Sequence, residues 1–153
     1  MRFHERSDTA TVIAINETET TFLKATLSKY PLVTNENREL TRSDDHDELE
    51  EDTELLRSSI KEHTDQSKTK LSEWLASDKI FTPKDSEWLL NVPNEDLDWF
   101  LQILNDLRVG SWQQLKCPSP EEIQALPLTP ETVEPLWTME LAGLLQSFLL
   151  RNH

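Results

Sequence analysis

The sequence predicts a mainly α fold, a compact bundle of about five helices with a short strand or hairpin at its N-terminus. The chain of 153 residues is the size of one domain, so residues 1–153 are predicted to form a single helical domain. The two glycines, Gly110 and Gly143, are too few for the many tight turns of a sandwich or barrel. The eight prolines mark breaks between helices.

The N-terminal segments “RFHER” and “ATVIAI” have β-branched residues on both sides of a short polar break, as in a hairpin or in one strand beside helices. Asn16 is a suitable N-cap, and apolar residues then recur at helical spacing until Pro31, which predicts the first helix. The polar segment at about 31–48 has no period that could bury a face. It is therefore predicted to be a mobile acidic connection.

The second helix is predicted to begin inside the acidic tract. Its apolar stripe is interrupted by His63 and Ser67, so a bend or break near this point stays open. Thr82 as N-cap and Pro83 at the first helical position predict a third, short helix. Pro93 would end it.

Asn94 is predicted to cap the fourth and most apolar helix, which has enough apolar residues to cover more than one face and should be central. In the proline-rich connector that follows, Ser119 and Pro120 can open one helical turn or two. The last helix opens near Thr129 or Pro135. Proline is expected only in the first turn of a helix, which favours a start close to Pro135.

The formal net charge of −14 disfavours nucleic acid and anionic membrane surfaces as partners, because binding to phosphates depends on Lys and Arg. The longest apolar runs are far short of the ~20 residues that span a bilayer. Cys117 is the single cysteine and cannot form an internal disulfide, and the N-terminal residues lack the apolar segment of a secretory signal. A cytoplasmic location is predicted.

Eight of the eleven residues from Asp44 to Glu54 are acidic. An EF-hand loop would need a glycine here, and a zinc site would need more His or Cys ligands than His46. We therefore predict a solvated acidic face and no bound metal or cofactor, with attraction of a basic partner as the second interpretation. A divalent-metal-dependent or otherwise cryptic enzyme, using the carboxylates around His46 and on the second helix, is the alternative function.

No catalytic residue is predicted, because the chain has no Gly-rich phosphate loop and no serine-nucleophile motif. The four histidines are scattered and none has the spacing of paired metal ligands. Cys117 lies before a proline in a connector, which favours a small apolar filler over a nucleophile. The protein is therefore predicted not to be an enzyme.

A polar group within the most apolar helix gives the candidate interaction patch. Asn105, Asp106 and Arg108 are predicted to form a polar strip hydrogen-bonded to adjacent helices, with a binding patch as the alternative. Trp99 or Trp112 would supply exposed anchors for such a patch.

The other tryptophans fit apolar stripes and are predicted to pack in the core. They are Trp74, Trp88 and Trp137.

The segments “LNDLRVGSWQQL” and “ELAGLLQSFLL” resemble a bacterial family of small, mostly helical domains of unknown function, which carries an L-N-D-x-R signature on its central helix. The resemblance implies a mostly helical fold with an opening strand, and it implies no activity. The matching positions are Leu104, Asn105, Asp106, Arg108, Gly110 and Leu115.

The sequence as a whole predicts a cytoplasmic, non-enzymatic protein–protein interaction or adaptor/regulatory module. Its partner is expected to be a protein, with a basic one favoured by the acidic surface. The oligomeric state stays open.

Overall fold

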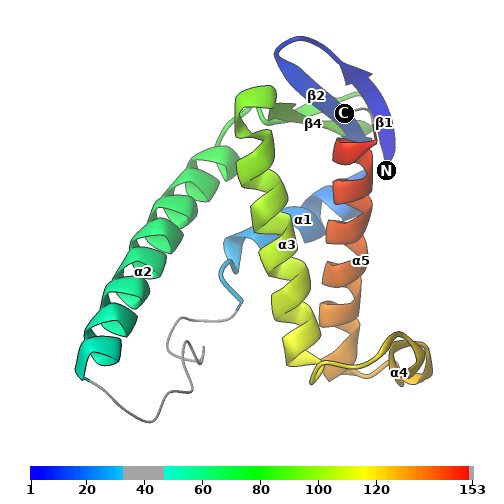
Figure 1. Cartoon of the computed structure of the whole chain (residues 1–153). Coiled ribbons are helices and arrows are strands. Elements are labelled where there is room, and N and C mark those ends of the chain that lie inside the picture. The colour runs from blue at the N-terminus through cyan, green and yellow to red at the C-terminus, as the bar shows by residue number, and fades with distance from the viewer. Residues whose placement is uncertain (33–46, 152–153) are drawn as a thin grey trace.

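The computed structural model describes residues 1–32 and 47–151. In this part of the chain five α-helices accompany a four-stranded antiparallel sheet (Figure 1). The predicted mainly α bundle is therefore wrong: the fold is mixed α/β, with helices predominating. The elements in order are β1 (Arg2–Arg6), β2 (Ala10–Ile15), α1 (Glu17–Ser28), α2 (Asp47–Leu75), β3 (Phe81–Lys84), β4 (Glu87–Pro93), the 3₁₀ helix η2 (Asn94–Asp96), α3 (Leu97–Gln114), α4 (Pro120–Ala125) and α5 (Pro130–Leu150).

The sheet has the order β1-β2-β4-β3, with every pair antiparallel. β1 and β2 form the N-terminal hairpin that was one of two expectations for this segment. β2 is buried from Thr11 to Ile15 and pairs with β4 along its whole length, with Ile13 opposite Leu90. Burial of β2 on both of its faces explains why “ATVIAI” is almost entirely apolar, with Thr11 its one polar residue.

The β3–β4 hairpin replaces the short helix predicted from Thr82 to Pro93. Lys84 pairs with Glu87, so Asp85 and Ser86 form a two-residue turn, and Asp85 has a φ of 55°. Pro83 lies in β3, an edge strand, where a proline can sit without breaking the sheet interior. The Thr-Pro pair is a local helix signal, and pairing of β4 with the distant β2 overrides it.

α1 begins as predicted. The side chain of its N-cap, Asn16, accepts a hydrogen bond of 2.7 Å from the backbone N–H of Glu19, whose carboxylate accepts one of 3.0 Å from the Asn16 N–H. The connection predicted at about 31–48 lies for the most part outside the described residues.

α3 does not begin with Asn94 as its cap. Asn94 opens η2, and its side chain donates to the carbonyl oxygen of Ser7 at 3.1 Å and accepts from the Thr11 hydroxyl at 3.5 Å. These bonds join the start of α3 to the β1–β2 hairpin. α3 then runs beside α5 (Figure 1), and both helices bury apolar residues against the sheet and each other.

α5 begins at Thr129, one of the two predicted starts, with Pro130 at the first helical position. The helix continues through Pro135, which is buried, so the expectation that this proline would lie in the first turn is wrong. The Pro135 ring removes one backbone hydrogen bond early in the helix, and its burial offsets part of that loss. Among the described residues no helix is long and apolar enough to cross a membrane.

α2 is one continuous helix of 29 residues, which answers the question of a break near His63. Only its C-terminal part packs on the body of the protein, through the buried residues Ser67, Leu71 and Trp74. Every side chain from Glu51 to Gln66 is exposed or half-buried. We call residues 51–66 the α2 arm, and Figure 1 shows that the N-terminal end of this helix stands away from the other helices.

Candidate functional site

The five residues of the candidate interaction patch do not form one surface. Trp99 lies between α3 and α2, where its ring meets Trp74 edge-on at 5.0 Å and its Nε1 donates to Ser67 Oγ at 3.1 Å. Asp106 is half-buried and accepts a hydrogen bond of 3.5 Å from the Tyr30 hydroxyl. Both side chains therefore hold neighbouring elements together, in agreement with the polar-strip interpretation for Asp106.

The other three residues line a groove of about 510 Å³ between α3 and α4. Asn105 is exposed, and the Arg108 guanidinium donates to Gln146 Oε1 on α5 at 2.7 Å. Trp112 is half-buried, and its Nε1 donates to the carbonyl oxygen of Pro118 at 2.8 Å. This groove keeps a part of the predicted patch together, and its binding of a partner stays a prediction.

The wall of the groove between α3 and α4 includes strained backbone. Lys116 and Cys117 follow each other with φ values of 67° and 56°, a region that non-glycine residues rarely occupy. Trp112 holds this turn from two sides, because its carbonyl oxygen also accepts from the Cys117 N–H at 3.0 Å. The Cys117 thiol is exposed and not the buried filler that the sequence favoured.

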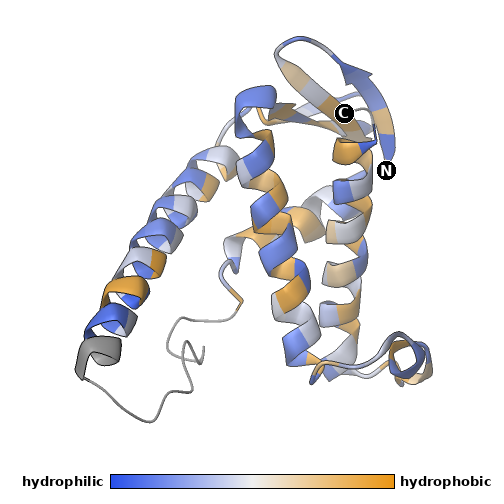
Figure 2. Ribbon diagram, in the orientation of Figure 1, coloured by the Kyte–Doolittle hydropathy of each residue, from blue (hydrophilic) through white to orange (hydrophobic). Residues whose placement is uncertain are grey.

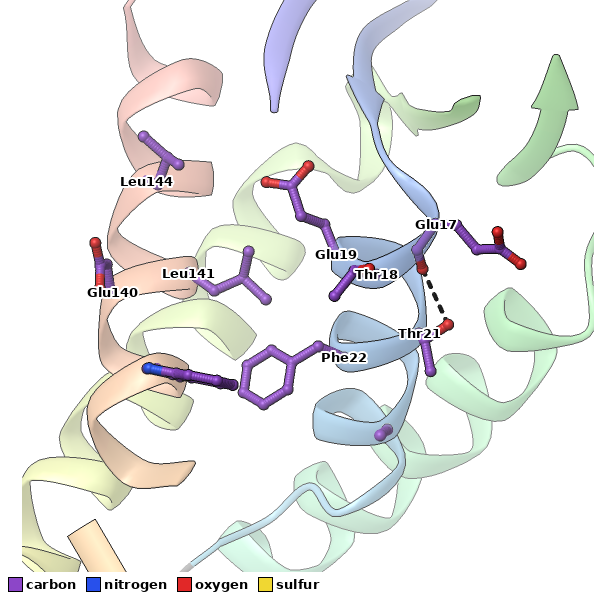
Figure 3. A pocket seen from close by; sticks show the side chains of 10 residues that line it. Glu17, Thr18, Glu19, Thr21, Phe22, Glu140, Leu141 and Leu144 are labelled. Carbon is purple, nitrogen blue, oxygen red and sulfur yellow. Dashed lines mark hydrogen bonds between the residues drawn. The ribbon is translucent and has the colours of Figure 1, made fainter. Parts of the chain in front are cut away.

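A larger groove lies between α1 and α5, and no residue pattern that we singled out from the sequence pointed to it. Its volume is about 790 Å³ (Figure 3). We call it the α1–α5 groove. Its lining residues are Glu17, Thr18, Glu19, Thr21, Phe22, Ala25, Trp137, Glu140, Leu141 and Leu144.

An aromatic pair forms the floor of the α1–α5 groove. The rings of Phe22 on α1 and Trp137 on α5 meet edge to face, with centroids 6.0 Å apart and planes at 76°. Trp137 is 57% exposed and Leu144 is 42% exposed, so apolar surface faces the open side. The expectation that Trp137 packs in the core is therefore wrong.

The reason lies in the two apolar stripes of α5. One stripe is buried within the fold and contains Thr138, Ala142, Leu145 and Leu149. The second contains Trp137, Leu141, Leu144 and Phe148, which also recur at helical spacing but are only half-buried or exposed. A helix with two apolar stripes needs two neighbours, and α1 covers the second stripe only in part. The doubled stripe is the sequence signal that could have located this groove.

Carboxylates surround the apolar floor. Glu17, Glu19 and Glu140 are the charged residues among those that line the α1–α5 groove, and Figure 3 shows Glu19 above the floor with Glu17 and Glu140 extending outward on its two sides. Glu19 is engaged in the α1 capping box, while Glu17 and Glu140 are exposed. Beyond α1, the exposed side chains of Lys29 and Glu134 form an ion pair between the C-terminal end of α1 and α5. The groove therefore favours a ligand with an apolar face and positive charges.

The described residues contain no group of three or more His, Cys, Asp or Glu side chains that could hold a metal ion. His63 is exposed on the α2 arm, whereas His46 and His153 lie outside the described residues. The alternative function, a divalent-metal-dependent enzyme, would use carboxylates around His46 and on α2. The geometry of the described part of α2 therefore adds no support for it.

Comparison of the chain with protein-family models, with curated proteins and with solved structures gave no match. The resemblance to the L-N-D-x-R family stays a prediction.

Proposed function

We propose that this protein is a non-enzymatic, cytoplasmic interaction module whose α1–α5 groove binds a basic, amphipathic helix. The observation that carries the proposal is Trp137, which is 57% exposed beside Phe22 in a concave, apolar surface. Tryptophans in such positions supply much of the affinity in protein interfaces. By binding such a helix, the protein would act as an adaptor or regulator.

The shape of the site supports a helical ligand. α1 and α5 form the two walls of an open groove that is lined mainly by apolar side chains (Figure 3). An amphipathic helix fits such a groove by placing apolar residues of one face at i, i+3, i+4 and i+7 against it. Large apolar side chains of the ligand would contact Trp137 and Leu144, which are the exposed apolar residues of the groove.

The charge of the site supports a basic ligand. Glu17 and Glu140 are exposed at the edges, and the whole chain has a formal net charge of −14. Such a field accelerates the encounter with a cationic partner and repels an anionic one. Specificity would come from the apolar contacts, since exposed ion pairs contribute only about 0–1 kcal/mol each.

A titration with model peptides tests the proposal. A fluorescent helical peptide with leucines on one face and lysines on the other is expected to bind, and its binding should weaken when salt rises from about 0.05 to about 0.5 M. A peptide with glutamates in place of the lysines should not bind. Trp137→Ala should weaken binding by at least about tenfold.

Leu128→Ala is the matched control. Leu128 is 76% exposed in the connector before α5 and does not line the groove, so its replacement should leave peptide affinity unchanged. Leu128→Ala should unfold at the wild-type temperature, whereas Trp137→Ala loses the ring contact with Phe22 and should unfold slightly earlier, so the affinities are compared at a temperature where both variants are folded. Equal affinity of the Trp137→Ala protein and the wild type for the lysine peptide would refute the assignment of this groove.

A further inference from the structure

The indole of Trp137 has an open face in the α1–α5 groove. Trp137 is 57% exposed, and among the described residues its one contact with another aromatic ring is that with Phe22. The two ring planes meet at 76°, so this edge-to-face contact covers at most one face of the indole. With more than half of the side chain exposed, the other face is available to a flat group of a ligand.

A carboxylate without a partner lies beside this ring. Glu140 follows Trp137 by three residues on α5, so the two side chains are neighbours on one side of the helix. Glu140 is exposed, lines the groove together with Trp137, and forms no ion pair or hydrogen bond with another described residue. Glu134, one turn before Trp137, differs in this respect, because its carboxylate pairs with Lys29.

The other charged residues of the groove do not compensate Glu140. No Lys or Arg is among the residues that line the α1–α5 groove. Glu19 is already paired, because its carboxylate lies 3.0 Å from the N-terminal ammonium of Met1 and also takes part in the α1 capping box. Glu17 is exposed, but Figure 3 shows it on the side of the groove opposite Glu140. Glu140 is therefore the carboxylate that a group resting on Trp137 would reach.

An open aromatic face beside a free carboxylate suits a guanidinium group. The guanidinium is planar, so it stacks on an indole and at the same time donates two parallel hydrogen bonds to a carboxylate. The ammonium group of lysine is a compact and more strongly hydrated charge, and it has no flat face to stack. The apolar stem of an arginine also covers aromatic surface.

We propose that the ligand helix of the α1–α5 groove carries an arginine that stacks on Trp137 and pairs with Glu140, an inference that rests on the function proposed for the groove. Apolar residues of the same ligand contact Leu144 and the edge of the aromatic pair. The positive charge of the ligand then has a fixed place in the groove, and the site distinguishes arginine from lysine.

Two peptides of equal charge test the inference. One is the lysine peptide described above, and the other has arginine at every lysine position. General attraction to the acidic surface is the same for both, so it does not affect the ratio of their two dissociation constants. The wild-type protein is expected to bind the arginine peptide at least about threefold more tightly in fluorescence anisotropy titrations. This ratio is also independent of the fraction of each protein preparation that is folded.

Three variants locate the preference. Glu140→Gln and Trp137→Leu should each bring the ratio close to about one, since the first removes the carboxylate and the second removes the flat ring but keeps a large apolar side chain. Glu17→Gln is the matched control, because Glu17 is the other exposed carboxylate of the groove. This control should weaken both peptides to the same extent and leave the ratio at its wild-type value.

Two results would overturn the arginine site. The first is equal affinity of the wild-type protein for the two peptides, and the second is a preference for arginine that persists in both Glu140→Gln and Trp137→Leu. A peptide with trimethyllysine at the same positions keeps the attraction to the ring but donates no hydrogen bond to Glu140. Tighter binding of this third peptide than of the arginine peptide would equally contradict the proposal.

The arginine site and the proposed function can fail separately. If the lysine and arginine peptides bind equally well and Trp137→Ala weakens both, the groove remains a docking site and only the assignment of the arginine is wrong. If neither peptide binds to the wild-type protein, both proposals fail.

Discussion

Trp99 Nε1 on α3 donates a hydrogen bond of 3.1 Å to the buried hydroxyl of Ser67 on α2. Ser67 had stood out in the sequence as a polar interruption of an apolar stripe. The structure shows the reason, because an indole N–H that packs against Trp74 and Phe100 needs an acceptor at this point. The long helix α2 is therefore held to the body by a polar contact within an aromatic cluster.

The first prediction concerns this contact. Ser67→Ala removes the acceptor and leaves the Trp99 N–H without its partner, which should lower the free energy of unfolding by about 1–3 kcal/mol in denaturant melts. Trp99→Phe in the Ser67→Ala background should cost less than Trp99→Phe alone, since the shared bond is already lost. Ser72→Ala, at an exposed site on the same helix, is the control. Additive effects of the two substitutions would show that the bond contributes nothing.

The second prediction concerns the turn at Lys116, where φ is 67°. Glycine adopts this conformation without the steric cost that a side chain brings, so Lys116→Gly should raise the free energy of unfolding by about 0.5–1 kcal/mol. Gln113→Gly, in the last turn of α3, should instead lower it by up to about 1 kcal/mol. The comparison is made by thermal and denaturant unfolding. Destabilisation by both substitutions would mean that Lys116 makes a contact worth more than its strain.

The third prediction concerns the α2 arm. Hydrogen exchange measured at low protein concentration should be at least about tenfold faster for amides of residues 51–64 than for those of residues 67–75, because only the second group belongs to a packed segment. Leu71→Ala should then accelerate exchange throughout the C-terminal part of α2. Uniformly slow exchange along the whole helix would show that the arm is covered in the monomer.

Local patterns were sufficient for the elements whose stability depends on neighbours in the sequence. Asn16 as the N-cap of α1 and the helical spacing in α1, α3 and α5 were present in the sequence and are confirmed, while Thr129 was one of two stated starts for α5 and the start that was favoured, close to Pro135, is wrong. The N-terminal hairpin was one of two stated options. These elements could be predicted because caps and periodicity act over a few residues.

The β3–β4 hairpin was missed for the opposite reason. Its stabilising partner, β2, lies far away in the sequence, and Leu90 finds Ile13 only in the folded chain. Thr82 and Pro83 are a sound helix start when considered alone, and burial of β4 between two other strands outweighs that preference.

By itself the sequence determined the acidic charge, the positions of most helices, and which residues are apolar enough to be buried. Only the tertiary structure decided which apolar residues remain exposed. Trp137 and Leu145 are both large apolar residues on one helix, yet Leu145 is fully buried and Trp137 faces an open groove beside Phe22. The physical reason is that burial depends on the number and placement of neighbouring elements: α1 covers the second stripe of α5 only in part, and no element of the described chain completes the cover.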